Sequence, residues 1–211
     1  MKKIIFVLGI VFLFSSNGFS QSPLNLGVKI GFNSSKMPTE FANVSDIKEQ
    51  AKTGFLAGAF VRINLSSIYL QPEIYFTKKG GSFQSATIPQ FQGKTFTQQT
   101  VLNTIDVPVL LGIKLINLKV VNLRLMAGPV ISFVTSKDIS YQVDGVNLGS
   151  LPSPTTDYKN TIWSIQAGAG IDVLKFSLDV RYEWGLNNIS DNGSMNSKTN
   201  LLNVSLGMKL F

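Results

Sequence analysis

The chain has 211 residues, 44% of them hydrophobic, and its 19 Lys and Arg residues against 12 Asp and Glu residues give a formal net charge of +7. It contains no Cys and no His, which excludes disulfides, thiolate metal sites and catalysis by a histidine base. The basic residues are scattered and form no cluster of the kind that binds nucleic acid, so we expect no nucleic-acid partner.

The first 20 residues have the parts of a secretory signal peptide. Met1 is followed by two lysines, an unbroken apolar run covers residues 4–14, and a short polar segment contains the small residues Gly18 and Ser20. The apolar run is too short to span a membrane as a helix. We predict export and cleavage after Ser20, which leaves residues 21–211 as one domain, and the alternative is an uncleaved anchor.

Eight segments follow in which apolar side chains alternate with polar or small ones. They cover residues 24–33, 54–63, 68–77, 104–114, 121–133, 163–173, 176–186 and 202–210. Alternation with a period of two over about ten residues is typical of a strand that crosses a membrane with one face toward lipid. The connections alternate as well: those near residues 65, 117 and 174 are short, and the four others are long and polar.

This pattern predicts an all-β fold, an eight-stranded antiparallel up-and-down transmembrane β-barrel in the outer membrane of a cell. The first and last segments must pair, because an open sheet edge in lipid leaves backbone groups without partners. Short turns face the periplasm in such barrels, so we expect both termini there and the four long loops outside. Pro72, Pro108 and Pro129 lie within predicted strands, where we expect bulges that shift the register.

All charged residues within the eight segments lie on the polar face. Since a cation on the lipid face at mid-membrane costs about 2–4 kcal/mol, we expect these charges inside the barrel. We predict that eight of them form a structural network of paired charges. They are Lys29, Arg62, Glu73, Asp106, Arg124, Asp179, Arg181 and Glu183. The alternative is that some of these carboxylates act as catalytic pairs.

The inward face also carries bulky side chains, which predicts a filled lumen, since an eight-stranded barrel is only just wide enough for its own side chains. These are Leu56, Phe60, Tyr69, Tyr75, Leu110 and Met126. On the opposite face, aromatic residues fall near the predicted outer rim, where an aromatic girdle is expected. They are Phe32, Phe55, Phe76, Phe133, Trp163, Tyr182 and Trp184.

Several short motifs, taken in order, resemble one family. Residues 70–80 (LQPEIYFTKKG) and 105–111 (IDVPVLL) are similar to two strands of the PorT-like outer-membrane β-barrel family, and residues 27–33, 127–129 and 179–186 fit others. The resemblance covers nearly the whole mature chain. It implies an eight-stranded barrel, with the strand prolines as family features. One namesake member of the family assists protein secretion across the outer membrane.

These observations predict a non-enzymatic outer-membrane protein with a filled lumen and four long extracellular loops. We expect an accessory of envelope assembly or protein secretion, with outer-membrane lipid and other envelope or secretion proteins as partners. The alternatives are a surface binding or adhesion module that acts through the loops, and a small passive pore. We predict no cofactor and no metal site, because no loop has the spacing of acidic residues found in calcium-binding loops.

Overall fold

The computed structural model describes residues 23–36, 39–41, 48–85, 96–118, 120–143, 146–147, 160–187 and 195–210. The predicted leader at residues 1–20 and parts of the long connections lie outside these residues. The described elements are strands: β1 (Leu24–Lys36), β2 (Thr39–Phe41), β3 (Lys48–Leu65), β4 (Ile68–Ser85), β5 (Phe96–Asn117), β6 (Val121–Val143), β7 (Val146–Asn147), β8 (Thr161–Val173), β9 (Phe176–Gly185), β10 (Met195–Ser197) and β11 (Asn200–Lys209). Within the described part of the chain, no helix is long and apolar enough to cross a membrane.

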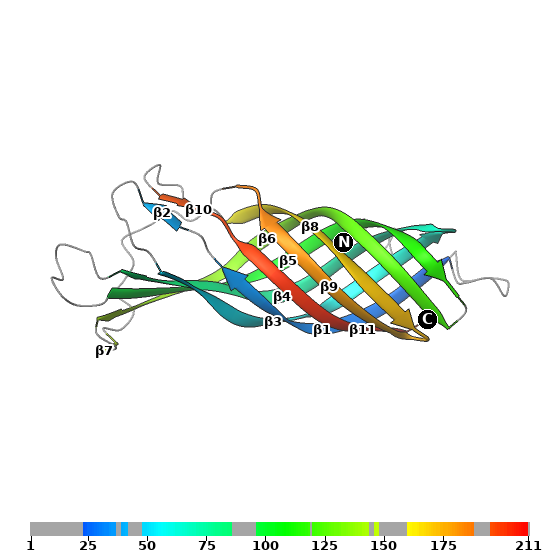
Figure 1. Cartoon of the computed structure of the whole chain (residues 1–211), viewed down its shortest axis with the longest axis horizontal. Coiled ribbons are helices and arrows are strands. Elements are labelled where there is room, and N and C mark those ends of the chain that lie inside the picture. Colours follow the sequence, from blue (N-terminus) through cyan, green and yellow to red (C-terminus); the bar gives the residue numbers. More distant parts are fainter. Residues whose placement is uncertain are drawn as a thin grey trace, which may run out of the picture.

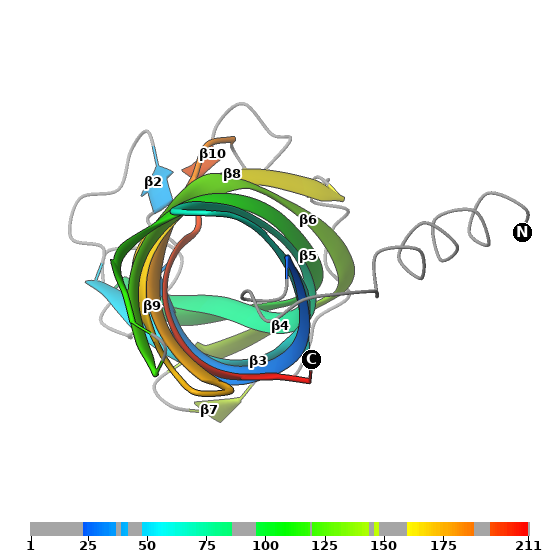
Figure 2. The same cartoon turned by 90° about the vertical axis from the view of Figure 1, so that its right-hand side faces the viewer.

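Eight of the strands form a closed antiparallel barrel (Figures 1 and 2). Their order around the wall is β5, β4, β3, β1, β11, β9, β8 and β6, and β6 pairs with β5 to close the ring. The predicted pairing of the first and last segments is confirmed, since β1 pairs with β11. The short strand β7 adds to the end of β6, and β2 and β10 pair with each other.

The strands are tilted relative to the barrel axis. A path of paired residues around the wall leaves β1 at Leu24 and returns to it at Ser34. It runs through Leu24, Ile63, Leu70, Leu111, Ala127, Ala167, Tyr182, Leu202 and Ser34. Such a stagger is what closure of a sheet into a barrel requires. Rows of paired residues therefore climb along the axis from β1 through β3 and β4.

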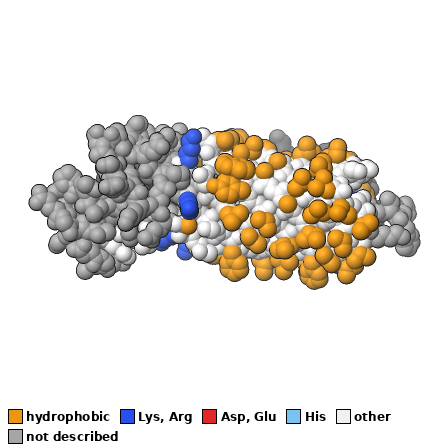
Figure 3. Space-filling model, viewed as in Figure 1, with side chains coloured by type: hydrophobic (Ala, Val, Ile, Leu, Met, Phe, Trp, Pro, Cys, Tyr) orange, Lys and Arg blue, Asp and Glu red, His pale blue; other side chains and the backbone are white. Residues whose placement is uncertain are grey.

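The two faces of the wall differ in chemistry as the alternation predicts. A belt of hydrophobic side chains covers the outer surface (Figure 3), and Phe32 and Ile30 are 71% and 65% exposed there. All six bulky residues predicted to point inward are buried. All seven aromatic residues predicted for one rim are exposed, and the rings of Phe55 and Phe76 are in contact at a tilt of 40°, with centroids 5.8 Å apart. The outer belt thus matches a lipid environment.

One end of the barrel, which we call the turn end, carries the three short connections. Two of them are two-residue turns, Ser66–Ser67 and Leu174–Lys175. Ser66 and Leu174 have positive φ angles of 64° and 54°. A positive φ at the first turn residue suits the twist of a tight hairpin, and it costs energy for a residue with a side chain.

At the opposite end, the loop end, four adjacent strands are much longer than predicted. Strands β3, β4, β5 and β6 have 18, 18, 22 and 23 residues, whereas β1, β8, β9 and β11 have 10 to 13. Parts of the segments predicted as loops at 34–51, 79–100 and 136–160 are therefore strand. The four strands extend past the others as a wall on one side of the barrel (Figure 1), which we call the β3–β6 wall.

The bulges predicted at the three strand prolines are wrong. The register between β4 and β5 is the same at Pro72 and at Asp106, on either side of Pro108, and the ladder from β6 to β8 runs through Pro129 without a shift. The shifts lie elsewhere, between Ala51 and Leu56, between Asn103 and Thr104, and between Lys114 and Ile116. A missing N–H removes one ladder hydrogen bond, whereas a one-residue slip moves every following side chain to the other face.

Candidate functional site: the charged interior

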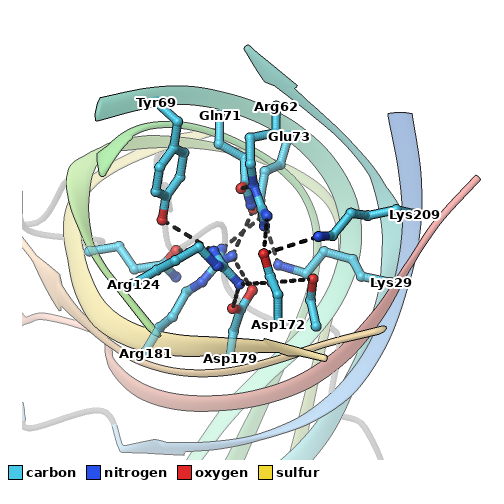
Figure 4. Close-up of polar contacts among 12 residues, drawn as sticks. Lys29, Arg62, Tyr69, Gln71, Glu73, Arg124, Asp172, Asp179, Arg181 and Lys209 are labelled. Carbon is cyan, nitrogen blue, oxygen red and sulfur yellow. Dashed lines mark hydrogen bonds and ion pairs between the residues drawn. The ribbon is translucent and has the colours of Figure 1, made fainter. Parts of the chain in front are cut away.

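All eight side chains predicted for the interior network are buried inside the barrel, with exposed fractions of 5% or less. Figure 4 shows how those from the centre and the turn end point toward one another across the lumen. They form three layers along the axis, at the centre, the turn end and the loop end. Each layer contains both signs of charge, which buried ions need because an unpaired charge away from water is expensive.

The central layer is built around Glu73 of β4. Its carboxylate accepts hydrogen bonds from Lys29 Nζ at 2.7 Å and from Arg181 Nη1 and Nη2 at 2.9 and 2.8 Å. The amide of Gln71 donates to the same carboxylate at 2.6 Å. Arg181 Nη2 also lies 2.6 Å from Asp179 Oδ2. Since β4 and β9 lie on opposite sides of the ring, the Glu73–Arg181 pair crosses the lumen.

Arg124 joins the central layer to the turn-end layer. Its Nη2 atom lies 2.7 Å from Asp179 Oδ1 and 2.8 Å from Asp172 Oδ1, and its Nη1 atom donates to the Tyr69 hydroxyl at 3.1 Å. Gly170 makes this arrangement sterically feasible. A Cβ atom there would lie 2.1 Å from Asp179 Oδ1 and 2.7 Å from Arg124 Nη2, so the space that a side chain would fill is taken by the ion pair.

In the turn-end layer, Asp172 of β8 is the shared acceptor. Arg62 Nη1 of β3 lies 2.7 Å from its Oδ2 atom, across the ring, and Lys209 Nζ lies 3.1 Å from the same atom. The Ser177 hydroxyl donates to Oδ1 at 2.7 Å. The guanidinium of Arg62 also sits 5.1 Å from the centre of the Tyr69 ring, a distance at which an aromatic face stabilises a cation.

The loop-end layer is centred on Lys79 of β4. Its ammonium lies 2.9 Å from Asp106 Oδ2 and 2.9 Å from Glu183 Oε1, and it donates to Ser132 Oγ at 3.0 Å. The Ser164 hydroxyl donates to Glu183 Oε1 at 2.9 Å. This layer again joins β4 to β9 across the lumen.

The predicted set of eight omits three charged residues that the structure places in these layers. Lys79 was assigned to a loop, because the alternation was followed only to Thr77; its continuation through Glu73, Tyr75, Thr77 and Lys79 is the signal that identifies it. Asp172 and Lys209 were placed on the polar face but not in the network. In the structure Asp172 is 2% exposed and is contacted by Arg62, Arg124 and Lys209.

Comparison with protein families gives one match, to a model described as the outer membrane protein beta-barrel domain, over residues 19–191. No curated protein matches the chain. Solved structures give distant similarities. Ail of Yersinia pestis, in complex with the heparin analogue sucrose octasulfate, is 12% identical over 89% of this chain and 99% of its own, with a TM-score of 0.41. Neisserial surface protein A is 12% identical over 88% and 97%, with a TM-score of 0.42. OprG from Pseudomonas aeruginosa is 9% identical over 88% and 95%, with a TM-score of 0.40.

Proposed function

The chain belongs to the outer membrane protein beta-barrel domain family, and from this we propose that it is a non-enzymatic, non-conducting barrel that binds other envelope or secretion proteins at its loop end. The observation that carries the proposal is the set of ion pairs across the lumen. These ion pairs fill the interior of the barrel, so the ends of the barrel are the surfaces that remain for binding a partner.

The orientation follows from the general design of outer-membrane barrels. The turn end faces the periplasm and the loop end faces outward, as short and long connections do in this class. Residues 1–20 act as a leader that is removed after Ser20. Two measurements test these points: N-terminal sequencing of the mature protein, and cysteine labelling on intact cells. The reagent should modify a cysteine at Ser136 and spare one at Asn117, and the reverse pattern would refute the orientation.

A closed lumen is supported by the geometry of the layers. Lys79–Glu183 and Arg181–Glu73 both join β4 to β9, and Arg62–Asp172 joins β3 to β8, each across the full width of the ring. An ion that passed through would have to separate buried pairs at 2.7 to 2.9 Å. Planar-bilayer recording of the refolded protein tests this directly. Steady conductance that survives deletion of the loops would establish the pore alternative.

The loop-end layer contains a serine–lysine contact, a pair of side chains that serves as nucleophile and base in some hydrolases. Lys79 lies between two carboxylates, so its ammonium is held in the charged form and offers Ser132 no base. The carboxylates themselves are each engaged by cations. This supports a structural role for the network and a non-enzymatic protein.

The β3–β6 wall supports a role in protein binding. It continues a hydrogen-bonded sheet beyond the level at which β1, β8, β9 and β11 end, and an exposed edge of such a sheet is a place where an extended segment of a partner can add as a strand. Together with the resemblance to the PorT-like family, it favours an accessory of envelope assembly or protein secretion. A surface binding or adhesion module that uses the same wall is the second candidate.

Site-specific photo-crosslinking in cells tests the proposed surface. The crosslinking residue replaces Thr135, which is exposed on the β6 part of the wall, and in a matched variant it replaces Asn117 at the turn end. We expect crosslinks to an envelope or secretion protein from Thr135 and none from Asn117. Crosslinks from Asn117 alone would show that the partner binds at the periplasmic end of the barrel and not at the β3–β6 wall. Crosslinks from Thr135 only to molecules outside the cell would favour the adhesion module.

A further inference from the structure

Four lysines lie on the outside of the barrel, on or next to four consecutive strands, just beyond the apolar belt on the side of the loop end. They are Lys198, two residues before β11, Lys36 of β1, Lys52 of β3 and Lys78 of β4, and we call them the lysine row. Lys36, Lys78 and Lys198 are exposed and Lys52 is half-buried. Figure 3 shows Lys and Arg side chains gathered at this boundary, between the hydrophobic belt and the loop end.

The register brings the four lysines together. Lys36 pairs with Asn200, two residues after Lys198, and Lys52 pairs with Ser35. The β-bulge that follows Ala51 turns Lys52 to the outer face, where it lies over Gly80: a Cβ atom at Gly80 would be 3.4 Å from Lys52 Cδ. Across that glycine, Lys52 Nζ donates to Gln99 Oε1 at 2.6 Å.

The lysine row is also level with respect to the membrane. Paired residues climb toward the loop end on passing from β11 to β1, β3 and β4, because the strands are tilted. On each next strand, however, the lysine lies one or two residues closer to the turn end than the residue that pairs with the previous lysine. This displacement toward the turn end nearly cancels the climb caused by the tilt, so the four ammonium groups lie at about one height along the barrel axis. That height is a short distance on the loop-end side of the aromatic residues Phe32, Phe55 and Phe76.

Among the described side chains of β1, β3, β4 and β11, Glu73 is the only carboxylate, and it points into the barrel, away from the lysine row. The ammonium groups of Lys52 and Lys78 repel each other electrostatically. Concentrated positive charge that is held on rigid strands at the edge of an apolar belt attracts anions located in the headgroup layer of a membrane.

We propose that the lysine row binds the phosphate groups of a phosphorylated glycolipid in the outer leaflet, with the acyl chains of that lipid against the apolar belt below. This inference rests on the proposed orientation of the barrel, which places the loop end outside. A lipid fits the site because its phosphates and its chains are offset along the membrane normal, as the lysines and the exposed Phe32 and Ile30 are. Soluble acidic molecules have no acyl chains to contact Phe32 and Ile30.

The test measures binding of lipid A to the purified full-length barrel in neutral detergent by native mass spectrometry. The variant K36Q/K78Q removes two charges from the lysine row. The matched control K137Q/K175Q removes two exposed charges elsewhere, at the β3–β6 wall and at the turn end. A third variant, K36R/K78R, keeps the charge. Retention of the folded gel mobility in all three shows that each variant is a native barrel.

We expect K36Q/K78Q to bind lipid A about 25-fold more weakly, at about fivefold for each lysine near a membrane surface. The control and the arginine variant should bind like the parent. Lipid A stripped of phosphate should bind the parent at least as weakly as lipid A binds K36Q/K78Q, because all four lysines then lose their partner. An excess of inorganic phosphate should not displace the bound lipid.

Equal binding by K36Q/K78Q and K137Q/K175Q would overturn the proposal, and so would tight binding of the dephosphorylated lipid. Displacement by inorganic phosphate would show a plain anion site in place of a lipid site, which also refutes it. The assay is carried out in solution and does not depend on orientation. The cysteine labelling described above tests the orientation separately, so failure of one is distinguishable from failure of the other.

Discussion

Replacement of Glu73 by Gln tests whether the interior network holds the barrel together. The substitution keeps the shape of the side chain and removes its charge. Among the described residues, Glu73 is the only carboxylate in ion-pair contact with Lys29, whereas Arg181 keeps Asp179 at 2.6 Å. One buried ammonium is therefore left unpaired. Breaking a buried pair in this way costs about 3–5 kcal/mol, and we expect a loss of about 4 kcal/mol in the free energy of unfolding.

A second variant separates the effect of the orphaned charge from the effect of lost packing. In the double variant K29M/E73Q the ammonium is removed with its partner, and paired replacement of buried ions by apolar groups is often nearly neutral. We expect it to recover about 2 kcal/mol of the loss. Glu183→Gln is a matched control: Lys79 keeps Asp106 at 2.9 Å, so the cost should be about 1.5–3 kcal/mol, the value of a charged hydrogen bond.

The measurement is urea unfolding in phosphatidylcholine vesicles. Trp163 and Trp184 are exposed on the outer belt, so their fluorescence reports insertion, and folded gel mobility provides a second probe. If Glu73→Gln unfolds within 1 kcal/mol of the parent, which is about the cost of an ordinary point mutation, the network contributes little to stability. A double variant as unstable as the sum of its two singles would mean that Lys29 and Glu73 are not coupled.

Three further predictions use the same unfolding assay. Lys79→Met should lower the free energy of unfolding by about 3–5 kcal/mol, because two buried carboxylates lose their shared cation. The control Lys78→Met, at the neighbouring position on the outer face, should change the free energy of unfolding by less than about 0.5 kcal/mol. Similar costs for the two variants would contradict the assigned faces. Ile74→Lys, in the apolar belt, should cost about 2–4 kcal/mol, whereas Thr53→Lys near the rim should cost about 0–1 kcal/mol; equal costs would place the belt elsewhere. Leu174→Gly should raise stability by about 1 kcal/mol, because glycine adopts the positive φ of this turn without strain; a loss of stability would show that the exposed leucine side chain contributes more than the strain costs.

The strand cores and their faces were predictable because lipid imposes a simple rule on them. A charge such as Glu73 or Arg124 cannot face the acyl chains, so alternation of apolar and polar residues fixes the face of every residue in the belt. The assignment of faces acts residue by residue along one segment and needs no knowledge of which strands are neighbours. Closure by β1 and β11 was predictable for a separate reason, because an open sheet edge in lipid leaves backbone groups without partners.

The parts that were not predictable depend on contacts between strands. In the β3–β6 wall beyond the apolar belt, polar residues such as Thr97 and Thr100 lie on both faces of the strand, so hydropathy no longer marks one face. Lys79 therefore looked like the start of a loop. The register at the prolines depends on how both neighbouring strands accommodate a missing donor, and the alternation around Pro72 and Pro129 contains no information about that.

The unequal strand lengths also give the molecule a direction within the plane of the membrane. A barrel of equal strands is nearly the same from every side. Here β3, β4, β5 and β6 are consecutive in the ring, so one half of the circumference is tall and the other is low. Neighbours that diffuse in the bilayer meet either the tall part or the low part of the barrel wall, depending on the side from which they arrive. A partner that binds the tall side would therefore take one defined rotational position around the barrel axis, and the lengths of the paired strands determine that position.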